Sequence, residues 1–327
     1  SFVREGANFV VVKDTKLALQ KWAQIHRENF RIPVIGITGS NGKTIVKEWL
    51  YQLLHYDYRI VRSPKSYNSQ VGVPLSLLQI REHHELGIFE AGISEPVEMM
   101  ALKLMIQPRI GIFTNIGDAH ASGFISKSQK LNEKLQLFND AETIFCCSDH
   151  HEVMQALKGH SAKVITWGES PSAEIRLLDK EYLSDRTRLK LSHQNNELKI
   201  FIPFNDEASI ENAMHCVAVL LHHELDETTI NQRLSQLHPI EMRLFQKQGI
   251  KDCLVVQDYY NSDIHSLEVA LNFARRQHRG GRFTVILSDI FQSEMEDEIL
   301  YRKVAELLER HSVDRLFAIG AAITQNE

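Results

Sequence analysis

The sequence has no long apolar run. None of its 327 residues lies in a segment that approaches the roughly 20 apolar residues of a membrane-spanning helix. The first residues, SFVREGANFVVVKD, also lack the basic-then-apolar order of a secretory signal peptide. These absences predict a soluble protein without a membrane span.

Cysteine is scarce, and its spacing excludes a zinc site. The four cysteines are Cys146, Cys147, Cys216 and Cys253, and no two of them form a CxxC pattern. Adjacent residues such as Cys146 and Cys147 are poor disulfide partners. We therefore expect reduced cysteines in the core and a cytoplasmic location.

A strong charge of either sign is missing too. The chain has 42 acidic and 37 basic side chains, a formal charge of −5, and 43% apolar residues. No basic stripe indicates a nucleic-acid surface, and no internal repeat or low-complexity tract is present. The length favours at least two domains.

Short β-rich runs alternate with helical patterns from Pro33 onward. The runs are VIGIT (34–38), YRIV (58–61), LGIFEA (86–91), RIGIFTN (109–115) and TIFCC (143–147). Between them, apolar residues recur at helical spacing at about 43–55, 95–105 and 128–140. This alternation predicts an α/β fold with a mostly parallel sheet.

The pattern changes twice in the second half of the chain. Residues 162–203 form strand-like segments without helical spacing, which predicts an antiparallel addition to the same domain. Helices are expected at about 208–222 and 227–237, and a boundary near 240. Beyond it, CLVVQDY, FTVILSD and RLFAIG predict a second βαβ array. Its length of about 85 residues is short for such a domain, so we expect a truncated one.

The segment GITGSNGKT, residues 36–44, predicts a phosphate site. A strand, a glycine turn and a helix start place backbone N–H groups and the helix dipole against an anion. Lys43 can reach the terminal phosphates and Thr44 can bind Mg²⁺. A strict Walker motif has glycine where this chain has Ile37, so the match is to a shorter G-x-x-G-K-T form. The alternative is an ordinary glycine turn with a solvated lysine.

Two further residues are expected at the same edge of the sheet. Glu90 ends a strand, and its carboxylate suits Mg²⁺, although a lone glutamate there could simply be solvated. The loop TNIGDAHASGF after the next strand contains His120. Lys130 and Lys134 lie one turn apart on a following helix, which by composition alone is a solvated face. The convergence of Glu90 and His120 with Lys43 and Thr44 favours an active site.

Several segments together resemble one enzyme family. They are GSNGKT, NSQVGVPLSLL, FEAGISEP, TNIGDAHASGF, EKLQLF, IENA, MRLF and QDYYNSDIHSL. In this order, from about residue 30 to 290, they resemble the ATP-dependent Mur ligases, and within these the MurF type. The resemblance implies that residues 1–32 are a remnant of an N-terminal UDP-substrate domain. It also implies a central P-loop ATPase domain at 33–240 and a Rossmann-like domain at 241–327.

The resemblance also implies residue roles. The catalytic residues would be Lys43, His120 and a carbamylated Lys134, and the Mg²⁺ ligands Thr44, Glu90, His120 and Lys134. The ATP-contacting residues would be Gly39, Ser40, Asn41, Gly42, Lys43, Thr44, Asn212, Arg243, Asp258, Tyr260 and Asn261. Ala208 and Ser209 replace a family His–Asn pair, and Lys130 is the alternative to Lys134 for the carbamate.

The implied reaction joins D-alanyl-D-alanine to a UDP-N-acetylmuramoyl tripeptide through an acyl phosphate. We expect a monomer, and EKLQLF and NSDIHSL are similar to segments of forms fused to an alanine racemase. Three alternatives stay open at this point. They are a folylpolyglutamate synthase, a nucleotide-binding switch without ligase activity, and a dinucleotide dehydrogenase, although the glycine spacing argues against the last.

Overall fold

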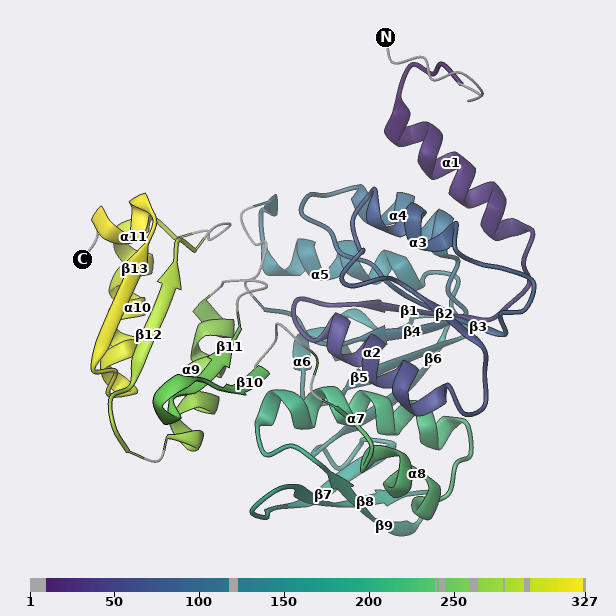
Figure 1. Cartoon of the computed structure of the whole chain (residues 1–327). Helices are drawn as coiled ribbons and strands as arrows, with labels where there is room; N and C mark the ends of the chain where they lie inside the picture. Colours follow the sequence, from purple (N-terminus) through teal and green to yellow (C-terminus); the bar gives the residue numbers. More distant parts are fainter. Residues whose placement is uncertain are drawn as a thin grey trace.

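A computed structural model describes most of the chain. The described residues are 10–117, 123–238, 240, 245–258, 264–278, 280–290 and 295–325. Figure 1 shows a large twisted sheet with helices on both faces, and a smaller group of elements near the C-terminus. The fold is therefore α/β, as the alternating pattern predicts.

The large sheet has nine strands in the order β2-β3-β1-β4-β5-β6-β7-β8-β9. Neighbouring strands are parallel from β2 to β7, and β8 and β9 continue the sheet antiparallel. The predicted antiparallel addition over 162–203 is confirmed for β8 and β9, but it is wrong for β6 and β7, which extend the parallel part of the sheet. The strands are β1 (Val34–Thr38), β2 (Ile60–Arg62), β3 (Leu86–Glu90), β4 (Ile110–Phe113), β5 (Thr143–Cys147), β6 (Lys163–Gly168), β7 (Ile175–Tyr182), β8 (Thr187–His193) and β9 (Asn196–Ile202).

The central strand β1 aligns two neighbours with the glycine turn that follows it. In this register Ile37 lies beside Glu90 of β3, and Thr38 lies beside Phe113 of β4. Every residue of β1 is buried, because helices cover both faces of the sheet. The carboxyl ends of β1, β3 and β4 therefore meet at one edge.

Each face of the sheet is covered by its own helices. One apolar cluster packs around α3 (Gly72–Leu77), α4 (Glu98–Ile106), α5 (Lys127–Leu135) and η2 (Gln136–Phe138). The N-terminal helix α1 (Thr15–Glu28) packs on α3 and α4. The short helix α6 (His151–Ala156) follows β5.

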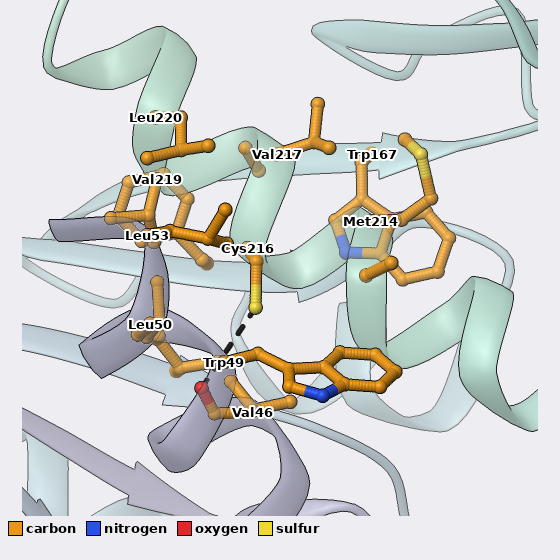
Figure 2. Packing of buried hydrophobic residues seen from close by; sticks show 14 of the residues in the cluster. Val46, Trp49, Leu50, Leu53, Trp167, Met214, Cys216, Val217, Val219 and Leu220 are labelled. Atoms are coloured by element: carbon orange, nitrogen blue, oxygen red, sulfur yellow. Dashed lines mark hydrogen bonds between the residues drawn. The ribbon is translucent and has the colours of Figure 1, made fainter. Parts of the chain in front are cut away.

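The other face is covered by α2 (Lys43–Leu54), α7 (Glu207–His222) and α8 (Glu227–Leu234). Figure 2 shows Val46, Trp49, Leu50 and Leu53 of α2 against α7, with Cys216 Sγ 3.8 Å from the Val46 carbonyl. These residues recur at helical spacing, so one side of α2 is apolar. Packing against α7 fixes which side of α2 faces the sheet.

The last strand of the sheet has its outer edge occupied by a side chain. Asn231 of α8 accepts a hydrogen bond from the Phe201 N–H and donates one to the Lys199 carbonyl, both at 2.8 Å. These two backbone groups of β9 point away from β8. The Asn231 amide thus substitutes for a neighbouring strand.

The C-terminal elements form two small sheets with a separate apolar cluster. The elements are β10 (Phe245–Gln248), η3 (Ile250–Asp252), β11 (Leu254–Gln257), α9 (Ile264–Gln277), β12 (Thr284–Ser288), α10 (Asp297–Arg310), β13 (Arg315–Ile319) and α11 (Ala321–Gln325). Strands β12 and β13 are parallel, as predicted. We propose that the predicted domain boundary near 240 lies between α8 and β10. The apolar cluster around α2, α7 and α8 ends there, and the separate C-terminal cluster follows it in the chain.

One predicted element of this region is wrong. The segment CLVVQDY was expected in the parallel array, but β11 pairs with β10 in an antiparallel hairpin. A tight turn explains the difference, because Gly249 N–H donates to the Cys253 carbonyl at 2.7 Å. A local hairpin and a strand of a parallel sheet have the same short apolar pattern.

Three of the four cysteines agree with the prediction. Cys146, Cys147 and Cys216 are buried free thiols, whereas Cys253 is exposed and does not belong to a core. Burial raises the pKa of Cys146 and of Cys147 to about 12. In the described ranges, no helix is both long and apolar enough to cross a membrane.

Truncating the α2–α7 contact should destabilise the protein strongly. Leu50 is completely buried, so Leu50→Ala is expected to lower the free energy of unfolding by about 2–5 kcal/mol through lost burial and a cavity. Leu17→Ala is the matched control, because Leu17 is 62% exposed and should change stability by about 0.5 kcal/mol or less. Urea unfolding followed by circular dichroism measures both, and equal losses would contradict the packing described.

Candidate active site

The glycine turn after β1 is shaped by close backbone approaches. Gly39 has φ +141° and Gly42 has φ +82°, a region that favours glycine. A Cβ on Gly39 would lie 2.0 Å from Thr114 Oγ1, and one on Gly42 would lie 2.2 Å from Asn212 Oδ1. Gly42 has no side chain to cap α2, an arrangement typical of helix N-termini that bind phosphate.

The segment after β4 holds this turn in place. Asn115 accepts from the Ser40 N–H through its carbonyl at 2.9 Å and from the Asn41 N–H through its side chain at 3.0 Å. Thr114 Oγ1 donates to the Asn41 carbonyl at 2.6 Å. The sequence analysis missed Thr114 and Asn115 as supports of the turn. Their position directly after the strand beside β1 is the signal that could have found them.

Lys43 and Thr44 begin α2 at the turn. The Lys43 ammonium donates to the Gly39 and Ser40 carbonyls at 2.8 and 2.9 Å, so it lies over the turn. Thr44 Oγ1 donates to Glu90 Oε2 at 3.0 Å and lies 2.9 Å from Ser66 Oγ. The structure therefore brings the hydroxyl and the carboxylate together, as the convergence argument predicts.

Glu90 is completely buried, so the solvated strand-end alternative is wrong for this residue. Its Oε2 also accepts from Asn68 Nδ2 at 3.4 Å. Its Oε1 lies 3.0 Å from Lys47 Nζ, an ion-pair contact without hydrogen-bond geometry, and accepts no hydrogen bond. Oε1 therefore faces the Lys47 cation, and Oε2 is the oxygen that lies beside the Thr44 hydroxyl.

The Thr44–Glu90 pair fits a magnesium ion. Two neighbouring ligands of an octahedral Mg²⁺ lie about 2.9 Å apart when each bond is 2.0–2.1 Å, which agrees with the 3.0 Å between these oxygens. Both are hard oxygen donors, which Mg²⁺ prefers. Among the residues that the structure describes, no three His, Cys, Asp or Glu side chains form a metal cluster.

Two buried lysines approach the turn from α5. Lys130 and Lys134 are 1% and 2% exposed, so the alternative of a solvated helix face is wrong. Lys134 Nζ donates to the Gly39 carbonyl at 3.1 Å, and Lys130 Nζ donates to the Gly117 carbonyl at 2.5 Å. Burial, and then the nearby charges of Lys43 and Lys130, lower the pKa of Lys134 well below its ordinary value.

The other predicted nucleotide residues are described only in part. Asn212 of α7 is buried against Gly42, and Asp258 directly follows β11. Ala208 and Ser209, which replace the family His–Asn pair, lie in the first turn of α7, where Asp206 accepts from the Ser209 N–H at 2.8 Å. Four residues lie outside the described ranges: His120, Arg243, Tyr260 and Asn261.

Comparison with known families assigns the chain. A model of the Mur ligase middle domain matches residues 37–220, which is more than half of the sequence. The chain belongs to the Mur ligase family. The matched segment contains the glycine turn, Glu90 and both α5 lysines.

Individual relatives agree with this assignment. The chain is 25% identical over 319 residues to a UDP-N-acetylmuramoyl-tripeptide–D-alanyl-D-alanine ligase of Bacillus subtilis, covering 97% of this chain and 69% of that one. The structure is similar to MurF from Acinetobacter baumannii, with a TM-score of 0.83 at 24% identity and coverage of 97% and 70%. It is also similar to MurF from Thermotoga maritima in complex with ADP, with a TM-score of 0.81 at 19% identity and coverage of 97% and 73%.

This Mur ligase has a buried histidine behind the glycine turn, which the sequence analysis missed. Trp167 Nε1 donates to His215 Nδ1 at 3.1 Å, so His215 Nε2 carries the proton and donates to the Thr114 carbonyl at 3.1 Å. Burial, followed by the charge of His150, lowers the pKa of His215 to about 3. The neutral imidazole of His215 thus links α7 by hydrogen bonds to Trp167 of β6 and to Thr114 beside the glycine turn.

His215 should make the stability of the Mur ligase depend on pH. Its folded-state pKa of about 3 lies below the unfolded value of 6.5, so the unfolded chain binds a proton that the folded chain does not. The stabilising contribution is complete above pH 6.5 and is lost as the pH falls toward 3. Between pH 6.5 and 5 we expect a loss of roughly 1.5 kcal/mol from this residue.

Urea unfolding at pH 6.5 and pH 5 measures this effect. His215→Asn keeps an acceptor for Trp167 but cannot titrate, so its stability should fall by roughly 1.5 kcal/mol less over this range. His151→Asn is the control for the loss of an imidazole, because His151 is exposed. An identical pH dependence in the parent and His215→Asn would contradict a neutral buried imidazole.

Proposed function

We propose that the chain is an ATP-dependent amide ligase that joins D-alanyl-D-alanine to a UDP-N-acetylmuramoyl tripeptide in peptidoglycan precursor synthesis. The observation on which this rests is the contact of Thr44 with the buried carboxylate of Glu90, beside a glycine turn that Lys134 also contacts. Relatives named for this reaction match 95–98% of the chain in several bacteria.

In this proposal the glycine turn binds the phosphates of ATP. Backbone N–H groups of residues 39–44 and the Lys43 ammonium neutralise the phosphate charge, which would otherwise repel an incoming carboxylate. Asn212, Arg243, Asp258, Tyr260 and Asn261 are proposed to contact the rest of the nucleotide. Support comes from the position of Asn212 against Gly42 and from the ADP complex of the similar Thermotoga maritima structure.

Thr44, Glu90, His120 and Lys134 are the proposed metal ligands. Bound Mg²⁺ supplies positive charge that stabilises the transferring phosphoryl group. Thr44 and Glu90 orient their oxygens toward each other at the start of α2, and Glu90 is shielded from water by its burial. These residues hold the phosphate end of the site in one geometry.

The reaction has two steps. A carboxylate of the tripeptide attacks the γ-phosphate, which forms an acyl phosphate and releases ADP. The amine of D-alanyl-D-alanine then attacks the acyl carbon, and a tetrahedral intermediate expels phosphate and leaves an amide. Lys43 stays within reach of the phosphoryl oxygens throughout, because the carbonyls of its own turn already position its ammonium.

We propose that Lys134 is carbamylated. A neutral amine attacks CO₂, loses a proton and becomes an oxygen-bearing anion, which binds a hard cation that an ammonium would repel. The lowered pKa of Lys134 supports a neutral amine, and its contact with the Gly39 carbonyl supports its place at the turn. Lys130, whose ammonium donates to the Gly117 carbonyl, is the alternative.

The ligase is proposed to act as a monomer in the cytoplasm. All the groups assigned above come from one chain, and three of its four cysteines are buried free thiols. A fusion to an alanine racemase stays a hypothesis that rests on the segments EKLQLF and NSDIHSL alone.

Phosphate release from ATP tests the proposed reaction. It should appear only when UDP-N-acetylmuramoyl tripeptide and D-alanyl-D-alanine are both supplied, and Lys43→Ala should abolish it because the phosphate charge is no longer neutralised. ATP hydrolysis that is indifferent to both substrates would instead support a nucleotide-binding switch. Dependence on glutamate would support a folylpolyglutamate synthase.

The carbamate has its own test. Lys134→Ala should lower turnover by about 100-fold or more, because an anionic oxygen ligand of the proposed metal site is lost, and short-chain carboxylates should restore part of it. ¹³CO₂ labelling followed by NMR should show a carbamate signal in the parent and in Lys130→Ala, but not in Lys134→Ala. A signal that disappears only in Lys130→Ala would move the modification to that residue.

A further inference from the structure

A second lysine of α2 is buried beside the candidate metal site. Lys47 lies one turn after Thr44, and its side chain is completely inaccessible to solvent. Its ammonium donates to the Ser63 carbonyl at 2.7 Å and to the Lys65 carbonyl. It also lies 3.0 Å from Glu90 Oε1 and 3.0 Å from Glu48 Oε1. Nothing in the reaction described above uses this cation.

The packing of α2 determines where Lys47 points. The apolar side of the helix lies against α7, as Figure 2 shows for Val46, Trp49 and Leu50. Thr44 and Lys47 are three residues apart and therefore share a different side of the helix. Both side chains reach Glu90 from that side.

The two oxygens of Glu90 have different neighbours. Oε1 lies beside the Lys47 ammonium, whereas Oε2 accepts from the Thr44 hydroxyl and from Asn68. A carboxylate has rotational freedom about its last side-chain torsion. A fixed cation next to one oxygen therefore restricts this torsion and keeps the other oxygen toward the start of α2.

Burial of the Lys47 ammonium costs free energy of folding. Burying an ammonium removes its hydration, and well-packed apolar residues often replace a buried ion pair without loss of stability. The Ser63 and Lys65 carbonyls, which accept from the Lys47 ammonium, also hold it in place. This arrangement places one positive charge against one oxygen of Glu90.

We propose that Lys47 is a positioning residue for the metal site: it anchors Glu90 Oε1 so that Oε2 faces Thr44 and can bind the cation together with the hydroxyl. This inference rests on the proposed function, because it assumes that Glu90 and Thr44 bind Mg²⁺. It extends that function to a residue that contacts neither ATP nor the metal.

Two effects of removing the cation have opposite signs, which makes the inference testable. Loss of a positive charge near the site would by itself strengthen the binding of a divalent cation. Loss of the anchor leaves a buried carboxylate without its partner, and its oxygens no longer keep the required orientation. A positioning role requires that the second effect exceed the first.

Mn²⁺ binding to the full chain in the presence of a non-hydrolysable ATP analogue measures the balance, with free Mn²⁺ determined by EPR. Lys47→Met should weaken Mn²⁺ binding by at least about tenfold, while binding of the analogue in EDTA stays within about twofold of the parent. Glu48→Gln is the matched control, since it removes the other carboxylate beside Lys47 and should change Mn²⁺ affinity by less than about twofold. Equal or tighter Mn²⁺ binding by Lys47→Met would overturn the proposal.

A double variant separates positioning from general damage. In the Glu90→Gln background, Lys47→Met should cause no further loss of Mn²⁺ affinity, because Lys47 positions only that carboxylate. The double variant removes both buried charges, so it is expected to fold even where Lys47→Met alone does not. A further loss of Mn²⁺ affinity in that background would show that Lys47 does not act through Glu90.

Failure of the proposed function has a different result. In that case the parent chain would release phosphate whether or not D-alanyl-D-alanine is present, and the differences in Mn²⁺ affinity between the variants would remain. A parent that bound no Mn²⁺ with the analogue would overturn both ideas.

Discussion

The parallel register of β1 between β3 and β4 is the constraint on which the candidate site depends. It brings the carboxyl ends of three strands to one edge, so that the glycine turn after β1 lies between Glu90 and the Thr114–Asn115 pair. Because both faces of these strands are buried, a shift in register would move apolar side chains out of two cores at once. The site thus takes its geometry from the sheet rather than from its own contacts.

The charged side chains at this edge of the sheet are buried. Glu90, Lys47, Lys130 and Lys134 are all at most 2% exposed, and each has polar partners on the turn or on neighbouring backbone. In such surroundings electrostatic interactions are stronger than at the surface, and unpaired charges are penalised more. The balance of charge among these four residues is therefore a condition for both the fold and the proposed chemistry.

Much of the fold follows from local patterns. The runs VIGIT and TIFCC coincide with β1 and β5. The loss of helical spacing after residue 162 correctly predicts strands, but only β8 and β9 continue the sheet antiparallel, because β6 and β7 join it in parallel. The meeting of Thr44 and Glu90 is also predictable, because parallel strands end at a common edge. The β10–β11 hairpin is not, because its apolar pattern does not distinguish a neighbour in a hairpin from one in a parallel sheet.

The supporting residues of the site illustrate what a single sequence cannot provide. From the sequence, Lys47 would be taken for a solvent-exposed lysine of a helix. His215 lies in an apolar helix, and no charged residue directly beside it in the sequence indicates a buried hydrogen-bonded histidine. Their partners, Glu90 and Thr114, are 43 and 101 residues away in the chain, so only the folded structure brings them together. The roles of His120, Arg243, Tyr260 and Asn261 stay predictions from the family resemblance.

The amide of Asn231 at the outer edge of β9 has a consequence for the behaviour of the protein in a crowded solution. An open strand edge invites the strand of another molecule to pair with it and so begin aggregation. Because Asn231 occupies the Phe201 N–H and the Lys199 carbonyl, an incoming strand cannot pair with these two groups of β9. One side chain thereby blocks part of one outer edge of a nine-stranded sheet.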